Sequence, residues 1–192
     1  MKKQILSITL LLSMSFLANS QTTLYKNNIG LRPFVINNNG AGIGLNYERY
    51  LDSTNNFSIY VPVDIIFLSS NNVSYFRLGG EEHSGFALNP TFRIYFKDPK
   101  KFNWYMGVGF YYGESLVKLT NRVYHSESKT FGTLVNFGFK STIKNRVTVC
   151  LDLGTGIAFI NRKDESDFQS YYFYDNKPNI IGSLNFQVGY NF

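Results

Sequence analysis

The sequence predicts an all-β protein: an eight-stranded antiparallel transmembrane β-barrel that follows a cleaved N-terminal signal peptide. Three observations lead to this fold class. The chain begins with a short export-type segment, nearly every segment from residue 29 onward alternates apolar and polar residues, and the connections between those segments alternate in length. Together they indicate an exported chain that holds many apolar groups without a long apolar segment.

The first twenty residues have the organisation of a secretory signal peptide. Two lysines precede the apolar run 5–17, which is shorter than the roughly 20 residues that a membrane-spanning helix needs. The run is followed by Ala18-Asn19-Ser20, with small residues at the two positions that a signal peptidase reads. We therefore expect a signal peptide over residues 1–20 and one mature domain over residues 21–192.

Composition argues against several classes of protein. The formal net charge is +6, and loss of the two lysines with the signal peptide leaves +4, spread along the chain rather than gathered in the basic stripe of a nucleic-acid binder. The single cysteine, Cys150, allows no intramolecular disulfide and has no Cys or close His partner for zinc. We therefore expect no nucleic-acid partner, no metal and no cofactor.

Period-two alternation is the main evidence for strands. In the last segment the apolar side chains of Leu184, Phe186 and Val188 alternate with Asn185 and Gln187. A strand separates two such sets onto opposite faces, whereas a helix would mix them around its axis. The same pattern predicts eight strands in all, over residues 29–36, 40–50, 57–67, 86–97, 102–113, 130–140, 147–160 and 179–192.

The connections between the predicted strands are short at one end and long at the other. The predicted short turns are residues 51–56, 98–101 and 141–146, and the predicted long polar loops are residues 68–85, 114–129 and 161–178. Outer-membrane barrels have short turns on one side of the membrane and longer loops on the other. Only the first outer connection, Asn37-Asn38-Asn39, departs from this rule by being short.

The apolar face is predicted to point outward, into lipid. The polar face is rich in glycine and short side chains, which suit a narrow interior, whereas the apolar face has the bulky side chains. A soluble ligand-binding barrel would have the reverse arrangement. Aromatic side chains also gather at the strand ends, as they do at membrane interfaces. They are Phe57, Phe102, Trp104, Phe139, Tyr190 and Phe192 near the short turns, and Phe67, Phe86, Tyr112, Phe131 and Phe159 near the long loops.

These features resemble the small outer-membrane β-barrel proteins of Gram-negative bacteria, especially the porin-like barrel domains common in Bacteroidetes. The end of the chain is similar to the signal that the barrel-assembly machinery reads, with Phe186, Val188, Tyr190 and Phe192 at its alternating apolar positions, although Gln187 stands where that signal usually has glycine. The resemblance implies location in the bacterial outer membrane, contact with outer-membrane lipid and lipopolysaccharide, and handling by the assembly machinery. We also expect a monomer.

Charged residues are predicted inside the barrel. A charge in a narrow lumen is costly unless it is paired or hydrated, and about eight strands leave little free width. Charges of both signs therefore predict an interior filled by ion-paired side chains rather than a continuous pore. The inward-facing charged residues are Arg32, Glu48, Asp64, Arg93, Lys140 and Asp152.

Three prolines interrupt the predicted strands. Proline has no backbone N–H, and a closed barrel uses its backbone donors in strand pairing. Pro33, Pro62 and Pro90 are therefore each expected to mark a bulge or a local break.

Three functions are compatible with this sequence. The first is a non-enzymatic barrel with a side-chain-filled polar lumen and outer loops for surface interaction; the second is a narrow porin that passes small solutes. The third is a lipid A-modifying acyl hydrolase or transferase, which would need an oriented histidine and serine. The two histidines, His83 and His125, are predicted to lie in long polar loops, and Glu127 stands where the similar deacylase has its serine. We therefore favour the first function and expect no catalytic residues.

Overall fold

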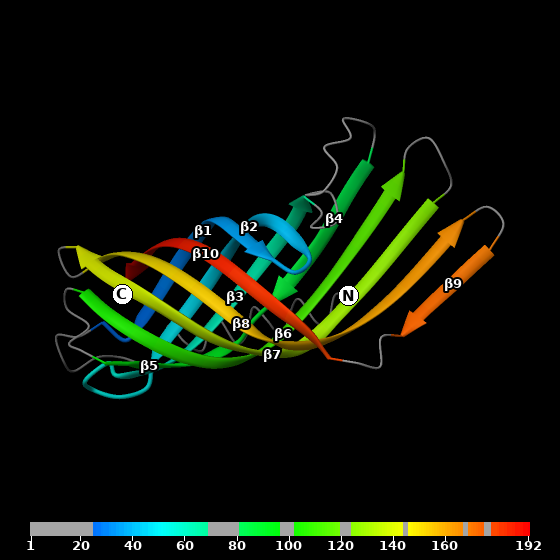
Figure 1. Ribbon diagram of the computed structural model, residues 1–192. Coiled ribbons are helices and arrows are strands. Elements are labelled where there is room, and N and C mark those ends of the chain that lie inside the picture. The colour runs from blue at the N-terminus through cyan, green and yellow to red at the C-terminus, as the bar shows by residue number, and fades with distance from the viewer. Residues whose placement is uncertain are drawn as a thin grey trace, which may run out of the picture.

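The structure is a computed structural model that describes residues 25–68, 81–96, 102–119, 124–143, 146–166, 169–174 and 178–192 (Figure 1). The predicted signal peptide lies outside these residues. Within the described ranges, no helix is long and apolar enough to cross a membrane. The strands are β1 (Asn27–Asn37), β2 (Gly40–Tyr50), β3 (Phe57–Leu68), β4 (Glu81–Leu88), β5 (Thr91–Tyr95), β6 (Phe102–Leu119), β7 (Tyr124–Ile143), β8 (Val147–Ser166), β9 (Gln169–Tyr174) and β10 (Asn179–Asn191).

These strands form one antiparallel sheet that closes into a barrel. β1 pairs with β2 on one side and with β10 on the other, and β10 continues the ring by pairing with β8. β4 and β5 follow one another along the same position, between β3 and β6, while β9 pairs with the far end of β8. The ring therefore has eight strand positions, which confirms the predicted eight-stranded barrel.

Burial alternates along the strands as the sequence predicts. Along β2 the even-numbered residues from Gly40 to Tyr50 are buried, while Ile43 and Leu45 between them are exposed. The largest apolar side chains lie outside the barrel: Phe110 is 72% exposed, Ile65 62% and Leu45 59%. Aromatic side chains on this outer surface contact one another across strands, as Phe57 and Phe92 do. The outer surface is thus a continuous apolar band.

The prolines fall where the pairing is irregular. The register of β1 shifts around Pro33 on both sides, so that Arg32 and Val35 both point inward although they are three residues apart. Pro90 lies in the break between β4 and β5. On the β2 side, Pro62 is in regular register with Asn46. On its other side, Pro62 faces the break between β4 and β5. The bulge expected at Pro33 and the break expected at Pro90 are confirmed, whereas Pro62 sits in a regular ladder on one side.

All three predicted long loops are wrong in part, because strands continue into each of them: β4 begins at Glu81, and β6, β7, β8 and β9 occupy parts of the other two. β6 and β7 remain paired from Phe102↔Ser141 to Leu119↔Tyr124, and β7 and β8 remain paired as far as Tyr124↔Ser166. The sequence is almost wholly polar in the extensions of β7 and β8, and Leu116, Val117 and Leu119 stand among polar residues in that of β6. The regular apolar alternation that indicates a half-buried strand is therefore lost there. Figure 1 shows the extensions of β6, β7 and β8 running past the barrel together with β4 and β9.

Glycines make room for large side chains inside the barrel. Gly138 of β7 lies beside Tyr105 of β6 and Asp152 of β8. A β-carbon on Gly138 would lie 2.4 Å from both Cζ and the hydroxyl oxygen of Tyr105 and 2.6 Å from the backbone oxygen of Leu151. The Tyr105 ring therefore occupies the space that a side chain at position 138 would take.

We predict that Gly138→Ala destabilises the barrel by about 1–3 kcal/mol, the usual cost of overpacking an interior. Urea unfolding of the refolded protein, followed by the difference in gel mobility between unheated and boiled samples, measures this cost. Gly182→Ala is the matched control, because a β-carbon there lies no closer than 3.8 Å to its nearest neighbour. Equal midpoints for the two variants would contradict the packing described here.

Candidate functional site: an ion-pair network in the lumen

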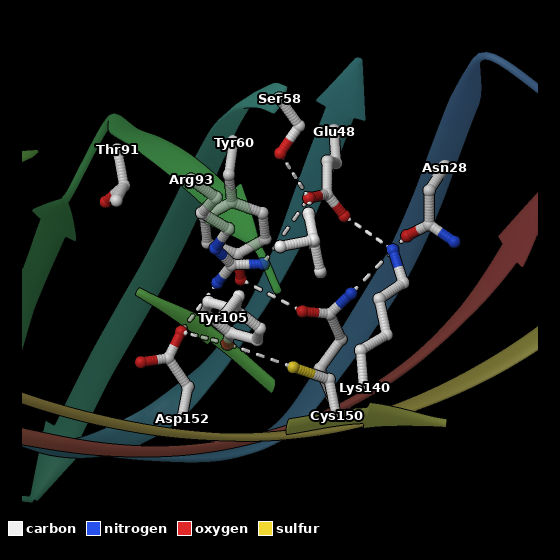
Figure 2. Close-up of polar contacts among 12 residues, drawn as sticks. Asn28, Glu48, Ser58, Tyr60, Thr91, Arg93, Tyr105, Lys140, Cys150 and Asp152 are labelled. Carbon is white, nitrogen blue, oxygen red and sulfur yellow. Dashed lines mark hydrogen bonds and ion pairs between the residues drawn. The ribbon is translucent and has the colours of Figure 1, made fainter. Parts of the chain in front are cut away.

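Four charged side chains from four strands meet inside the barrel. Glu48 comes from β2, Arg93 from β5, Lys140 from β7 and Asp152 from β8, and each is at most 5% exposed. Figure 2 shows them converging with the tyrosines around them. Alternation along each strand directs these side chains inward, and closure of the ring brings them together although they are far apart in the sequence.

Glu48 is the central acceptor of this network. Its Oε2 atom accepts a hydrogen bond of 2.6 Å from Lys140 Nζ, and its Oε1 atom lies 3.8 Å from Arg93 NH1. Oε1 also accepts hydrogen bonds from the hydroxyls of Ser58, at 2.7 Å, and Tyr95, at 2.5 Å. A buried carboxylate with this many donors is compensated for its loss of water.

Arg93 connects the two acidic residues and is held by aromatic rings. Its NH2 atom lies 2.6 Å from Asp152 Oδ2. Its guanidinium carbon lies 3.3 Å from the centroid of the Tyr60 ring and 4.3 Å from that of Tyr105 (Figure 2). Cation–π attraction is strongest where water is excluded, so the two rings stabilise the charge and fix the plane of the guanidinium.

Hydrogen bonds also join the hydroxyls of two tyrosines to the charged groups. The Tyr105 hydroxyl donates to Asp152 Oδ2 at 2.8 Å and lies 3.1 Å from Cys150 Sγ. Lys140 Nζ donates to the Tyr50 hydroxyl at 2.7 Å. These tyrosines are buried beside the ion pairs, so the network is aromatic as well as charged.

A second ion pair lies nearer the long-loop end. Arg32 of β1 pairs with Asp64 of β3 through Arg32 NH1 and Asp64 Oδ1, and both residues are buried. They flank Gly44 of β2, which is in register with each of them and leaves space for the pair. The buried charged residues of the described chain are then three cations and three anions, so the interior has no net charge.

The structure places all six sequence-predicted charged residues in the interior. Glu48, Arg93, Lys140 and Asp152 belong to the main network, and Arg32 and Asp64 form the separate pair. The buried tyrosines of the lumen are absent from the site residues that the sequence predicts. In the sequence these tyrosines stand on the same inward-facing positions of the alternating strands as the charged residues, and this is the pattern that could have identified them. They are Tyr50, Tyr60, Tyr95 and Tyr105.

The apolar residues proposed as an assembly signal lie on the outer face of β10. Val188 is 38% exposed and Tyr190 is 41% exposed, while Phe186 and Phe192 are half-buried. The strand that presents them is the one that closes the ring: β10 pairs with β1 from Asn191↔Asn28 onward, and the backbones of Phe192 and Asn27 exchange hydrogen bonds beyond it. A role as a signal stays a prediction.

The predicted loop positions of the two histidines are wrong. His83 lies in β4, with its backbone paired to Val117, and His125 lies in β7, with its backbone paired to Lys118 and Glu165. Both belong to the strand extensions, where the sequence shows no apolar alternation. In the described part of the chain, no cluster of three or more His, Cys, Asp and Glu residues is arranged to hold a metal ion.

Comparison with known proteins shows the fold. No family model matches the chain, and no curated protein sequence matches it. The N-terminal β-barrel domain of Pseudomonas aeruginosa OprF superposes with a TM-score of 0.56 at 10% identity, covering 88% of this chain and 98% of that one. A major outer membrane protein from Thermus thermophilus superposes with a TM-score of 0.59 at 13% identity, covering 89% of this chain and 100% of that one.

The chain therefore has the architecture of an eight-stranded outer-membrane barrel. The particular Bacteroidetes type that the sequence resembles stays a prediction.

We predict that Arg93→Met lowers the free energy of unfolding by about 3–5 kcal/mol, because Glu48 and Asp152 lose a shared buried cation. Urea unfolding in detergent measures the change. Arg49→Met is the matched control, since Arg49 is only half-buried and lies on the outward-facing register of β2. A loss for Arg93→Met no larger than that for the control would show that the network contributes little to stability.

Proposed function

We propose that the chain is a non-enzymatic integral protein of the bacterial outer membrane, with a filled lumen and a projecting sheet for surface interaction. The apolar outer band supports insertion in lipid. Side chains such as Leu45, Ile65 and Phe110 are exposed in the isolated barrel, and contiguous apolar surface of this extent is costly in water. The proposal includes export through the signal peptide and contact with outer-membrane lipid and lipopolysaccharide.

The observation that supports a non-conducting barrel is the neutral, packed ion-pair network. Glu48, Arg93, Lys140 and Asp152 contact one another across the lumen, and Tyr60 and Tyr105 stack on the guanidinium between them. An aqueous pore keeps free width and directs charge toward the passing solute. Here each charge is paired with an opposite charge, which favours the anchoring function over the narrow porin.

The projecting sheet supports the interaction part of the proposal. β6 has 18 residues, and β7 and β8 have 20 each, whereas a tilted strand crosses the hydrocarbon core in about 9–11 residues. Roughly half of each strand therefore extends beyond the membrane on the long-loop side. Its surface is charged: Lys129 Nζ lies 3.3 Å from Glu127 and 3.6 Å from Glu114. Such a sheet offers a rigid polar surface to a partner or a neighbouring lipopolysaccharide layer.

We expect the refolded protein to show no stable open level in a planar bilayer at moderate salt. The measurement is single-channel current, with the gel-mobility shift as the check that the sample is folded. A current level whose size rises with salt concentration would favour the porin function and would contradict the filled lumen.

We predict that Leu45→Arg reduces the folding free energy in lipid vesicles by about 2–4 kcal/mol, the cost of Arg on the lipid face near the bilayer midplane. Leu45 stands in the middle of β2 and is 59% exposed on the outer face. The fraction refolded against urea measures the effect, and Leu45→Phe is the control that keeps the position apolar. A soluble barrel would tolerate Leu45→Arg as well as it tolerates Leu45→Phe.

A further inference from the structure

A cluster of one arginine and two tyrosines lies on the outside of the barrel, at the short-turn end where β1 begins, β10 ends and β8 begins (Figure 1). Arg146, in the turn that leads into β8, is exposed. Its Nε atom donates a hydrogen bond of 3.0 Å to the Tyr25 hydroxyl, and its NH1 atom donates one of 2.5 Å to the Tyr190 hydroxyl. The guanidinium carbon lies 5.5 Å and 5.8 Å from the centroids of the two rings. The three side chains therefore form one cluster across the strands that close the barrel.

The backbone around the cluster fixes its position. The Arg146 carbonyl oxygen accepts a hydrogen bond of 2.8 Å from the Asn191 N–H, and the Arg146 N–H donates to the Ile143 carbonyl oxygen at 3.1 Å. The Tyr25 carbonyl oxygen accepts a hydrogen bond of 3.2 Å from Asn55 Nδ2. The guanidinium is thus held in place before any ligand binds, and such preorganisation lowers the entropic cost of binding.

The guanidinium has donors that the protein does not use. Arginine has five N–H donors, and beyond the two that the tyrosine hydroxyls accept, Arg146 makes no other side-chain hydrogen bond within the described residues. Nor does a described side-chain carboxylate form an ion pair with it. Asp52, in the turn that contacts Tyr25, accepts hydrogen bonds from the backbone N–H groups of Asn56 and Phe57 instead. The cluster therefore has a fixed cation without an anion.

Apolar surface adjoins this cation. Tyr190 is in register with Val147 of β8 on one side and with Ile29 of β1 on the other. The side chains of Val147 and Ile29 are 40% and 51% exposed on the outer face, and Val188, two residues along β10 from Tyr190, is 38% exposed. A phospholipid has the same division, with an anionic phosphate beside apolar chains. A soluble anion would meet only the cation.

We propose that Arg146, Tyr25 and Tyr190 form a binding site for the phosphate group of a phospholipid, whose acyl chains lie along Ile29 and Val147. A guanidinium matches the geometry of phosphate oxygens, and tyrosines are favoured at membrane interfaces. The short turns of outer-membrane barrels face the periplasm, where the leaflet consists of phospholipid. The inference rests on the proposed location in the outer membrane and assigns a lipid contact there to particular residues.

Native mass spectrometry of the refolded protein in non-ionic detergent tests the site. Phosphatidylglycerol is the ligand, and its two matched analogues are a diacylglycerol with the same chains, which lacks the phosphate, and glycerophosphate, which lacks the chains. We expect the barrel to retain phosphatidylglycerol, and neither analogue to displace it at equal concentration. Arg146→Gln should weaken retention about tenfold or more, because charge-assisted hydrogen bonds to the phosphate are lost.

Three further variants make the result specific. Arg146→Lys keeps the charge without the planar group and should restore part of the affinity that Arg146→Gln loses. Tyr25→Phe with Tyr190→Phe keeps both rings but removes the hydroxyls that hold the guanidinium, so affinity should fall less than in Arg146→Gln. Lys129→Gln removes a cation that is 49% exposed on the long-loop side and should leave retention unchanged. The gel-mobility shift is measured for every variant to show that it is folded.

Three results would overturn the inference. Retention that is equal in Arg146→Gln and Lys129→Gln would place the lipid elsewhere. Diacylglycerol retained as well as phosphatidylglycerol would show that the apolar surface binds by itself, and displacement by glycerophosphate would show an anion site that takes no lipid. A protein that is soluble without detergent and shows no mobility shift would instead overturn the proposed membrane location. A folded barrel in detergent whose lipid retention is independent of Arg146 would overturn the site alone.

Discussion

The barrel depends on the pairing of β1 with β10, which joins the two ends of the sheet. The two strands pair from Asn28↔Asn191 to Leu31↔Val188, although β1 and β10 lie at opposite ends of the described chain. Closure removes the exposed edges that an open sheet would present, and in lipid such edges would leave backbone groups without partners. Once the ring is closed, every second side chain must enter a narrow interior, so the composition of that interior follows from the alternation.

Crowding in the interior explains why large side chains lie beside glycines. Tyr105 lies over Gly138, and Asn136 and Ser183 approach each other over Gly154. A small barrel cannot accept a large residue at every inward position, so neighbouring strands alternate bulk with glycine. In the same interior Glu48 and Asp152 both lie against Arg93, and this pairing offsets the cost of burying the charges.

The barrel and the strand extensions differ in the residue pattern of their strands. Within the barrel, the outer face is apolar and the inner face meets packed side chains, so inward and outward residues alternate along the strands except at irregularities such as the bulge at Pro33. In the extensions of β6, β7 and β8 the sequence is mostly polar, and the strands are joined by backbone pairing and by ion pairs such as Lys129–Glu114. The protein thus combines a closed barrel with a mostly polar extension in one continuous set of strand pairings.

By itself, the sequence determined the strand count, the outward direction of the apolar side chains and the inward direction of Arg32, Glu48, Asp64, Arg93, Lys140 and Asp152. Alternation with a period of two is a local property, so it is readable without knowledge of the partners. It failed at His83 and His125, because strands that are polar on both faces have no such period.

Only the tertiary structure decided which inward residues meet. The contact of Glu48 with Lys140, the stacking of Arg93 between Tyr60 and Tyr105, and the separation of Arg32–Asp64 from the main network all depend on the stagger between strands. That stagger is set by bulges and breaks such as those at Pro33 and Pro90, and by closure between residues at opposite ends of the chain. Those are long-range constraints, which the residues of a single strand do not record.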